Sequence, residues 1–207
     1  MATIQEMQQI LKNMKALGAE QDWSYGFIES LISQIEAGRD LSRNQIGYYD
    51  RAKSLYSDEV VANAAAFGGK YTASEEMQTI FKYALRYYER VGYYSRIVKT
   101  YKDNDERIPT ERDYNKVVEN KYFKGIWNNY KATPKYEVGT AVAFSSKADR
   151  YYTTHFPNGA IVMSNDIKFE EIKTHAKGGR MVKLLPIGGA EMIICEEREL
   201  KRFPKNR

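Results

Sequence analysis

The chain has little of what catalytic, secreted and membrane proteins need. It contains one cysteine, Cys195, two histidines, and no apolar run near the ~20 residues that span a bilayer. A single cysteine excludes an internal disulfide and favours a reducing compartment. The segment MATIQEMQQI lacks a basic region followed by an apolar core, so it does not predict a secretory signal. We therefore expect a cytoplasmic protein with no membrane partner.

Recognisable catalytic patterns are also missing. His155 and His175 stand apart, and the sequence has no HExxH, CxxC, G-x-S-x-G or Rossmann pattern. Cys195 falls in EMIICEE at a strand position, where a buried, inert thiol is expected. The sequence thus predicts no metal site, no cofactor and no enzymatic activity.

Charge is present but unevenly distributed. Residues 1–81 hold 7 Lys and Arg against 11 Asp and Glu, whereas residues 82–135 hold 13 against 7 and residues 136–207 hold 12 against 9. The net charge of +5 therefore belongs to the middle and the end of the chain. Such asymmetry is typical of proteins that meet a polyanion, although a solvated helix face also explains it.

Apolar residues at helical spacing fill the first two thirds of the sequence. We predict helices over about 4–17, 23–37 and 43–56, the last opened by a capping box of Ser42 and Gln45. A short helix over 58–67 should stop at Gly68, and a longer one, capped by Thr72, should run to about Tyr101. The segment 111–130 predicts one further helix. Residues 1–132 are thus predicted to form an α-helical domain of about six helices.

After residue 135 the apolar spacing falls to about two residues, which indicates strands. The segments YEVGTAVAF, GAIVMS, RMVKLLPIGGAEMIICEE and ELKRF predict five short strands, with a hairpin at Gly188 and Gly189. We expect residues 136–207 to form a small antiparallel barrel of the SH3-like type. The predicted fold class is therefore α+β.

The stretch RYYERVGYYSRIVKTYKD, residues 86–103, mixes tyrosine with cations. On one continuous helix, Tyr87, Tyr88 and Tyr94 fall on the apolar side and are expected in the core. The opposite side is predicted to contact phosphates, with a tyrosine that can stack on a base. Its residues are Lys82, Arg86, Arg90, Tyr93 and Arg96. A solvated basic face is the alternative.

A second basic group lies in the segment THAKGGRMVK, around two adjacent glycines. Lys177, Arg180 and Lys183 are predicted phosphate contacts, because such a turn lets the backbone approach a ligand closely. A flexible hairpin loop is the alternative. The aromatic loop at 151–156 would mark a contact surface if exposed, and would cover the mouth of the barrel if folded back.

The segment FIESLISQIEAGRDLSRNQIGYYDRAKSLY, residues 27–56, resembles uncharacterised bacteriophage proteins. The matching positions are Phe27, Ser30, Leu31, Gln34, Leu41, Ser42 and Gln45. The resemblance implies a phage-type source, hence a host cytoplasm, and no defined activity. Our leading hypothesis is a non-enzymatic accessory protein that associates with DNA or RNA. The alternative is an adaptor that docks on a host or viral protein through its helical domain or its aromatic loop.

Overall fold

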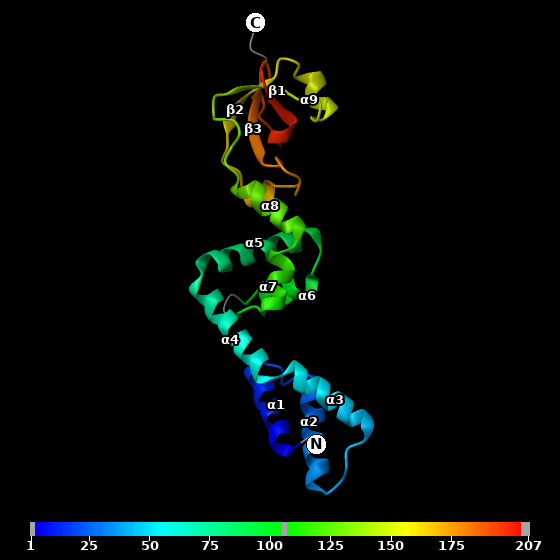
Figure 1. Ribbon diagram of the computed structural model, residues 1–207. Coiled ribbons are helices and arrows are strands. Elements are labelled where there is room, and N and C mark those ends of the chain that lie inside the picture. The colour runs from blue at the N-terminus through cyan, green and yellow to red at the C-terminus, as the bar shows by residue number, and fades with distance from the viewer. Residues whose placement is uncertain (1–2, 105–106, 204–207) are drawn as a thin grey trace. The chain divides into compact units, whose positions relative to one another are not determined.

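The computed structural model describes residues 3–104 and 107–203 (Figure 1). The chain divides into two compact units. Unit 1 comprises Met1–Glu75 with Ile108–Glu111, and unit 2 comprises Glu76–Arg107 with Arg112–Arg207. The chain therefore leaves unit 1, builds the first part of unit 2, returns briefly at 108–111 and then completes unit 2. Whether 136–207 folds alone stays a prediction.

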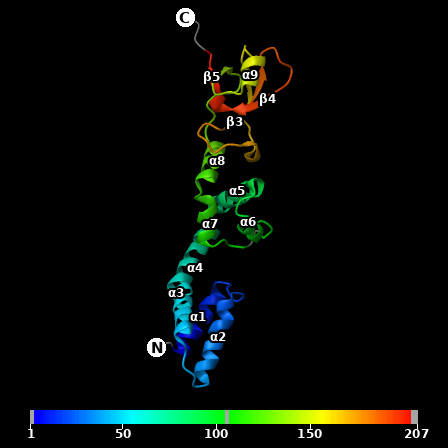
Figure 2. The same ribbon diagram turned by 90° about the vertical axis from the view of Figure 1, so that its right-hand side faces the viewer.

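Unit 1 is helical, with α1 (Ile4–Ala16), α2 (Trp23–Glu36), α3 (Arg43–Leu55) and α4 (Asp58–Ala73). The capping box of Ser42 and Gln45 is confirmed, because each side chain bonds the other residue's backbone amide. The helices α1, α2 and α3 pack side by side, as both views show (Figure 2). Their shared core consists of Met7, Ile10, Met14, Ile28, Leu31, Tyr49 and Ala52.

The predicted end of the fourth helix at Gly68 is wrong. The helix α4 continues through both glycines to Ala73, and the Thr72 hydroxyl donates to the Gly68 carbonyl instead of capping a new helix. A glycine inside a helix costs about 1 kcal/mol relative to alanine. Phe67 and Tyr71, both buried on this helix, supply apolar burial that outweighs the cost.

Unit 2 opens with four helices where the sequence predicted two. They are α5 (Glu75–Val91), α6 (Ser95–Tyr101), α7 (Glu111–Val118) and α8 (Lys121–Lys131). The first break lies between Val91 and Ser95. It contains Gly92, at φ 75°, and Tyr94, at φ 52°, both in the left-handed region. The second break falls at Asn120, whose side chain accepts from the Tyr122 amide and caps α8. Both predictions of one continuous helix are therefore wrong.

Aromatic rings fill the core of the helical part of unit 2. Phe81 of α5 stacks on Tyr114 of α7, with ring centroids 5.7 Å apart. Tyr83 of α5 meets Phe169 at 4.7 Å. Phe169 begins the 3-10 turn η1 (Phe169–Glu171) and also contacts Trp127 and Tyr130 of α8. One turn between two strands thus inserts its ring among the helices.

The rest of unit 2 is a five-stranded antiparallel sheet in the order β4-β3-β2-β1-β5. Its strands are β1 (Ala141–Phe144), β2 (Ala160–Ser164), β3 (Met181–Pro186), β4 (Ile193–Glu196) and β5 (Leu200–Arg202). A second 3-10 turn, η2 (Glu197–Glu199), precedes β5. The predicted α+β class is confirmed, but β4 and β5 are both edge strands, so the sheet is not closed into a barrel.

The hairpin and the first strand differ in how well the sequence predicts them. The hairpin between β3 and β4 is confirmed, with Gly188 at φ 85° in its turn. The first strand begins later than predicted, at Ala141. Tyr136 is buried before it, and its hydroxyl donates to the Leu200 carbonyl at 3.0 Å. This hydrogen bond anchors the segment that joins α8 to the sheet.

The aromatic loop at 151–156 is partly helical and largely folded back. It forms α9 (Arg150–His155), from which Tyr152 and the following Phe156 pack against the core of the sheet. Tyr152 also donates its hydroxyl to the Ile194 carbonyl on the edge strand β4. Tyr151 remains exposed and stacks on His155, 4.3 Å away. Most aromatic residues of this loop therefore cover the sheet, as the second of the two interpretations predicts.

Candidate functional site

The arginines predicted to bind phosphates on α5 have structural partners. Arg90 donates to the carbonyl of Glu170 at 2.5 Å and to that of Ile172 at 2.9 Å. Arg86 lies 3.7 Å from the Glu170 carboxylate and over the ring of Tyr83. These two side chains fasten the turn η1 to α5. The Glu170 carboxylate partly offsets the charge of Arg86, whereas Arg90 has two of its donors occupied by neutral carbonyls.

The predicted residues near β3 are engaged in a similar way. Arg180 donates to the carbonyls of Tyr130 at 2.7 Å and Asn165 at 2.9 Å, so it bridges α8 and the sheet. Lys183 pairs with Glu171 at 3.8 Å. The structure therefore brings Arg86, Arg90 and Lys183 together, but around an acidic turn rather than around an open surface.

The remaining predicted residues lie at separate places. Lys82 is exposed on α5 and Arg96 is exposed on α6. Tyr93, with 68% of its surface exposed, stands at the break between these helices and lines a cavity of about 280 Å³. Lys177 is exposed in the loop before β3.

A row of exposed side chains on α8 was not predicted from the sequence. At 3.6 residues per turn, Lys121, Lys124, Asn128 and Lys131 fall within an arc of roughly 80°. All four are exposed, whereas Phe123 and Ile126 on the other side are buried. The spacing of i, i+3, i+7 and i+10 was visible in KYFKGIWNNYK, and a helical wheel of this segment would have found it.

The loop 173–177 docks directly on α8. A Cβ atom built on Gly125 would lie 2.3 Å from the His175 carbonyl oxygen, so only glycine allows this approach. The Asn129 side-chain amide donates to the carbonyls of Thr174 at 2.8 Å and Ala176 at 2.9 Å. The ring of His175 meets that of Tyr122 edge-on, with centroids 4.8 Å apart. Three kinds of contact therefore fix the loop on the helix.

Docking places the outward side chains of the loop beside those of α8. Lys173, His175 and Lys177 alternate along the loop and are exposed, while Thr174 and Ala176 are half-buried toward the helix. We call the combined set the lysine surface. Its members are Lys121, Lys124, Asn128, Lys131, Lys173, His175 and Lys177.

Most of the charge on the lysine surface is not paired. Among the described residues, Lys124 is the only one of its five lysines in an ion pair, with Glu119. Lys121 and Lys131 lie over the rings of Tyr122 and Trp127, at 5.0 Å and 5.8 Å from the centroids. These contacts extend the stems along aromatic rings and leave the ammonium groups at the surface.

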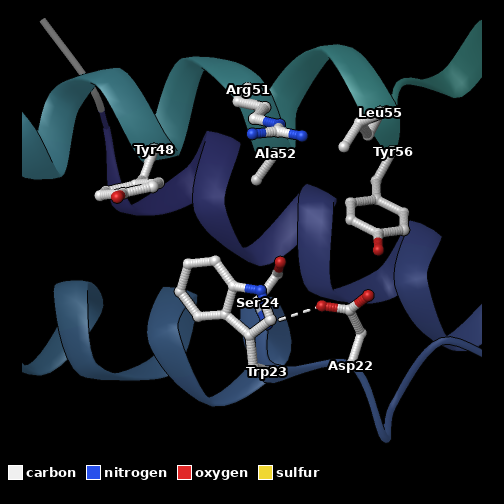
Figure 3. A pocket seen from close by; sticks show the side chains of 8 residues that line it. All are labelled: Asp22, Trp23, Ser24, Tyr48, Arg51, Ala52, Leu55 and Tyr56. Carbon is white, nitrogen blue, oxygen red and sulfur yellow. Dashed lines mark hydrogen bonds between the residues drawn. The ribbon is translucent and has the colours of Figure 1, made fainter.

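Unit 1 contains a separate pocket of about 200 Å³ between the start of α2 and α3 (Figure 3). The residues that line it are Asp22, Trp23, Ser24, Tyr48, Arg51, Ala52, Leu55 and Tyr56. Arg51 and Ala52 of α3 line it on one side, and Trp23 and Ser24 of α2 line it on the other. On α3, Tyr48, Ala52 and Leu55 lie within one narrow arc, and Arg51 borders this arc.

Side chains suited to holding a metal ion do not converge in the described part of the chain. Within residues 3–104 and 107–203, no group of three His, Cys, Asp or Glu side chains is placed to hold a metal ion. Burial raises the pKa of the Cys195 thiol to about 12, so this cysteine is not a ready nucleophile. No helix among these residues has the length and apolar character needed to cross a membrane.

Comparison with known proteins adds no family. No family model matches the chain, and neither a curated protein nor a solved structure is similar to it. Function is therefore inferred from the geometry and charge of the two candidate sites, the lysine surface and the pocket of unit 1.

Proposed function

We propose that this protein is a non-enzymatic accessory protein that binds nucleic acid through the lysine surface. The observation that carries the proposal is the docking of the loop 173–177 on α8 at Gly125. It unites the cations of two segments that lie about fifty residues apart in the sequence. A row of largely unpaired lysines suits a phosphate backbone, because each ammonium that replaces a condensed counterion adds binding free energy.

The aromatic members suggest which form of nucleic acid fits best. Tyr122 is 43% exposed and stands beside His175 at the edge of the lysine surface. An exposed ring beside a track of cations can stack on an unpaired base, which a duplex does not offer. We therefore expect the protein to bind single strands more tightly than duplexes of equal length.

We further propose that the sheet is of the SH3-like type. In support, β1 to β4 pair in chain order, and β5 returns to β1 after the 3-10 turn η2. In such an arrangement the loops between strands commonly carry the binding residues. The loop between β2 and β3 contains Lys173, His175 and Lys177, which agrees with this use.

The proposal is tested by titrating fluorescently labelled single-stranded and duplex oligonucleotides with the whole chain over a range of salt concentrations. The test variant carries Lys121→Gln, Lys124→Gln and Lys177→Gln. The matched control, with Lys12→Gln, Arg43→Gln and Lys70→Gln, removes the same charge from unit 1. Loss of three phosphate contacts should reduce the slope of log K against log salt by about 2 for single strands.

The control variant should retain a slope close to that of the wild type. Equal losses in the two variants would mean that only net charge matters, and the lysine surface would not be the interface. If the wild-type chain binds no oligonucleotide at low salt, the proposed function is wrong. A slope that does not change in the test variant would place the phosphate contacts elsewhere.

A further inference from the structure

The pocket of unit 1 has the composition of a protein-recognition site. Trp23 is 64% exposed and Tyr48 50% exposed, although both rings are large and apolar. They contact each other edge-on at 5.8 Å, and Phe27 supports both from 5.3 Å and 5.9 Å. Trp, Tyr and Arg are the residue types that contribute most to binding at protein interfaces. Here all three line one hollow.

Three of the polar side chains that line the pocket are donors without partners among the described residues. Among the described residues, the side chains of Arg51, Trp23 and Tyr48 make no hydrogen bond, and Arg51 forms no ion pair. Asp22 is different, because its carboxylate accepts from the Ser24 amide at 2.9 Å. This hydrogen bond is the main cause that lowers the pKa of Asp22. The acid is thus satisfied as the cap of α2, and a guanidinium and an indole N–H are left for a ligand.

Size limits what the pocket can hold. Its volume of about 200 Å³ is below the ~300–1,000 Å³ typical of pockets for drug-sized ligands. The apolar wall formed by Ala52, Leu55 and the ring of Tyr56 can take one side chain. An adjacent carboxylate would then lie near Arg51, which can bind it through two parallel hydrogen bonds. One residue that carries both groups is the C-terminal residue of a polypeptide.

The charge of unit 1 argues against a nucleic-acid strand at this site. Residues 1–81 carry 11 acidic against 7 basic side chains, so a strand with several phosphates would be repelled. A single carboxylate beside the unpaired Arg51 keeps the local attraction and brings little further negative charge. The observations therefore favour a peptide end over a polyanion.

The pocket is held in shape before any ligand arrives. The buried side chain of Asn13 donates to the Tyr56 carbonyl and to the Asp58 carboxylate, both at 2.8 Å. These bonds fix the corner between α3 and α4 and the backbone from which the ring of Tyr56 projects. A wall that does not reorganise on binding saves the entropy that a mobile one would lose.

We propose that the pocket of unit 1 binds the C-terminal residue of a partner protein, with an apolar side chain against Leu55 and Tyr56 and the carboxylate on Arg51. This interaction is independent of the nucleic-acid interface in unit 2. It would make the chain an adaptor between a protein with an apolar C-terminus and a nucleic acid.

Nuclear magnetic resonance of the 15N-labelled whole chain tests this proposal through the indole N–H signal of Trp23. This signal is assigned by its disappearance in the variant Trp23→Phe. The probes are N-acetyl-leucyl-leucine as the free acid, its C-terminal amide, and uridine monophosphate. The acid should shift the signal saturably, and the amide should bind about tenfold more weakly, because it lacks the charge-assisted hydrogen bonds. Arg51→Gln should reduce the affinity for the acid by the same factor of about ten. The acid and the amide should then bind this variant equally well.

Arg43→Gln, which removes an exposed cation from the same helix, is the matched control and should leave both affinities unchanged. Equal binding of acid and amide to the wild type would overturn the role of Arg51. Tighter binding of uridine monophosphate than of the peptide acid would make this a nucleotide pocket instead. If no probe moves the Trp23 signal, the site does not bind a peptide end. None of these outcomes depends on the oligonucleotide titration.

Discussion

Gly125→Ala should separate the loop 173–177 from α8. In an ordinary helix this substitution is favourable by about 1 kcal/mol, because alanine has the higher helix propensity. Here the new methyl group would lie 2.3 Å from the His175 carbonyl oxygen and 2.7 Å from its Cβ. Neither atom is the far end of a flexible side chain, so the loop backbone has to move away from the helix.

The cost follows from the contacts that the movement breaks. The two hydrogen bonds from Asn129 to the loop carbonyls contribute about 1 kcal/mol each. The edge-on contact of Tyr122 with His175 contributes about 1 kcal/mol more. After the gain in helix propensity is subtracted, unit 2 should be destabilised by about 2 kcal/mol. Lys173 and Lys177 would also leave the lysine surface, and the affinity for nucleic acid should fall.

Urea unfolding of unit 2 is measured through Trp127 on α8, in a Trp23→Phe background that silences the tryptophan of unit 1. The matched control is Gly47→Ala in α3, where a Cβ meets nothing within 4 Å. With Trp23 as the reporter, this control should stabilise unit 1 by about 1 kcal/mol. A Gly125→Ala variant at least as stable as the wild type would refute the close docking of the loop, and with it the continuity of the lysine surface.

Two further predictions concern other contacts. Arg90→Gln removes the hydrogen bonds to the Glu170 and Ile172 carbonyls, so it should destabilise unit 2 by about 2 kcal/mol in the Trp127 urea assay. It should leave the salt dependence of nucleic-acid binding unchanged. A changed slope of log K against log salt would contradict this structural role. The hydrogen bond from Lys53 is the main cause that lowers the pKa of Glu6 from 4.5 to about 2. The unfolded chain therefore binds the proton more readily than the folded one. Unit 1 should lose stability as the pH falls from about 4.5 to 2. Glu6→Gln should flatten this acid dependence in unfolding experiments followed through Trp23.

Local features of the fold could be predicted from the sequence because neighbouring residues determine them. Ser42 and Gln45 form their capping box within four residues, and Gly188 supplies the left-handed backbone of its own turn. The breaks in the long helices were harder, since the apolar spacing continues through both. Gly92 was a visible signal for the first break, but Tyr94 adopts a positive φ that residue type alone does not predict.

The candidate site shows the same limit more strongly. A helical wheel places Arg86 and Arg90 on the side of α5 that faces away from the core of unit 2, and both are exposed in the structure. It could not show that Glu170, some eighty residues later, pairs with one of them and accepts from the other. Likewise, the exposed lysines of α8 could be predicted from their spacing. Their proximity to Lys177 depends on the long-range packing of the loop at Gly125. Sequence order contains no direct record of such contacts.

The late completion of unit 2 along the chain has a consequence for synthesis on the ribosome. The helix α5 is made early, but its aromatic partners Tyr114, Phe123 and Phe169 are translated later. Until then the apolar side of the nascent helix has only part of its native contacts, such as that of Phe81 with Tyr101 of α6. Unit 1 can form its core of α1 to α3 first, while α5 must wait for most of the remaining chain. Truncated products that end shortly after α6 should therefore be ready substrates for chaperones and proteases.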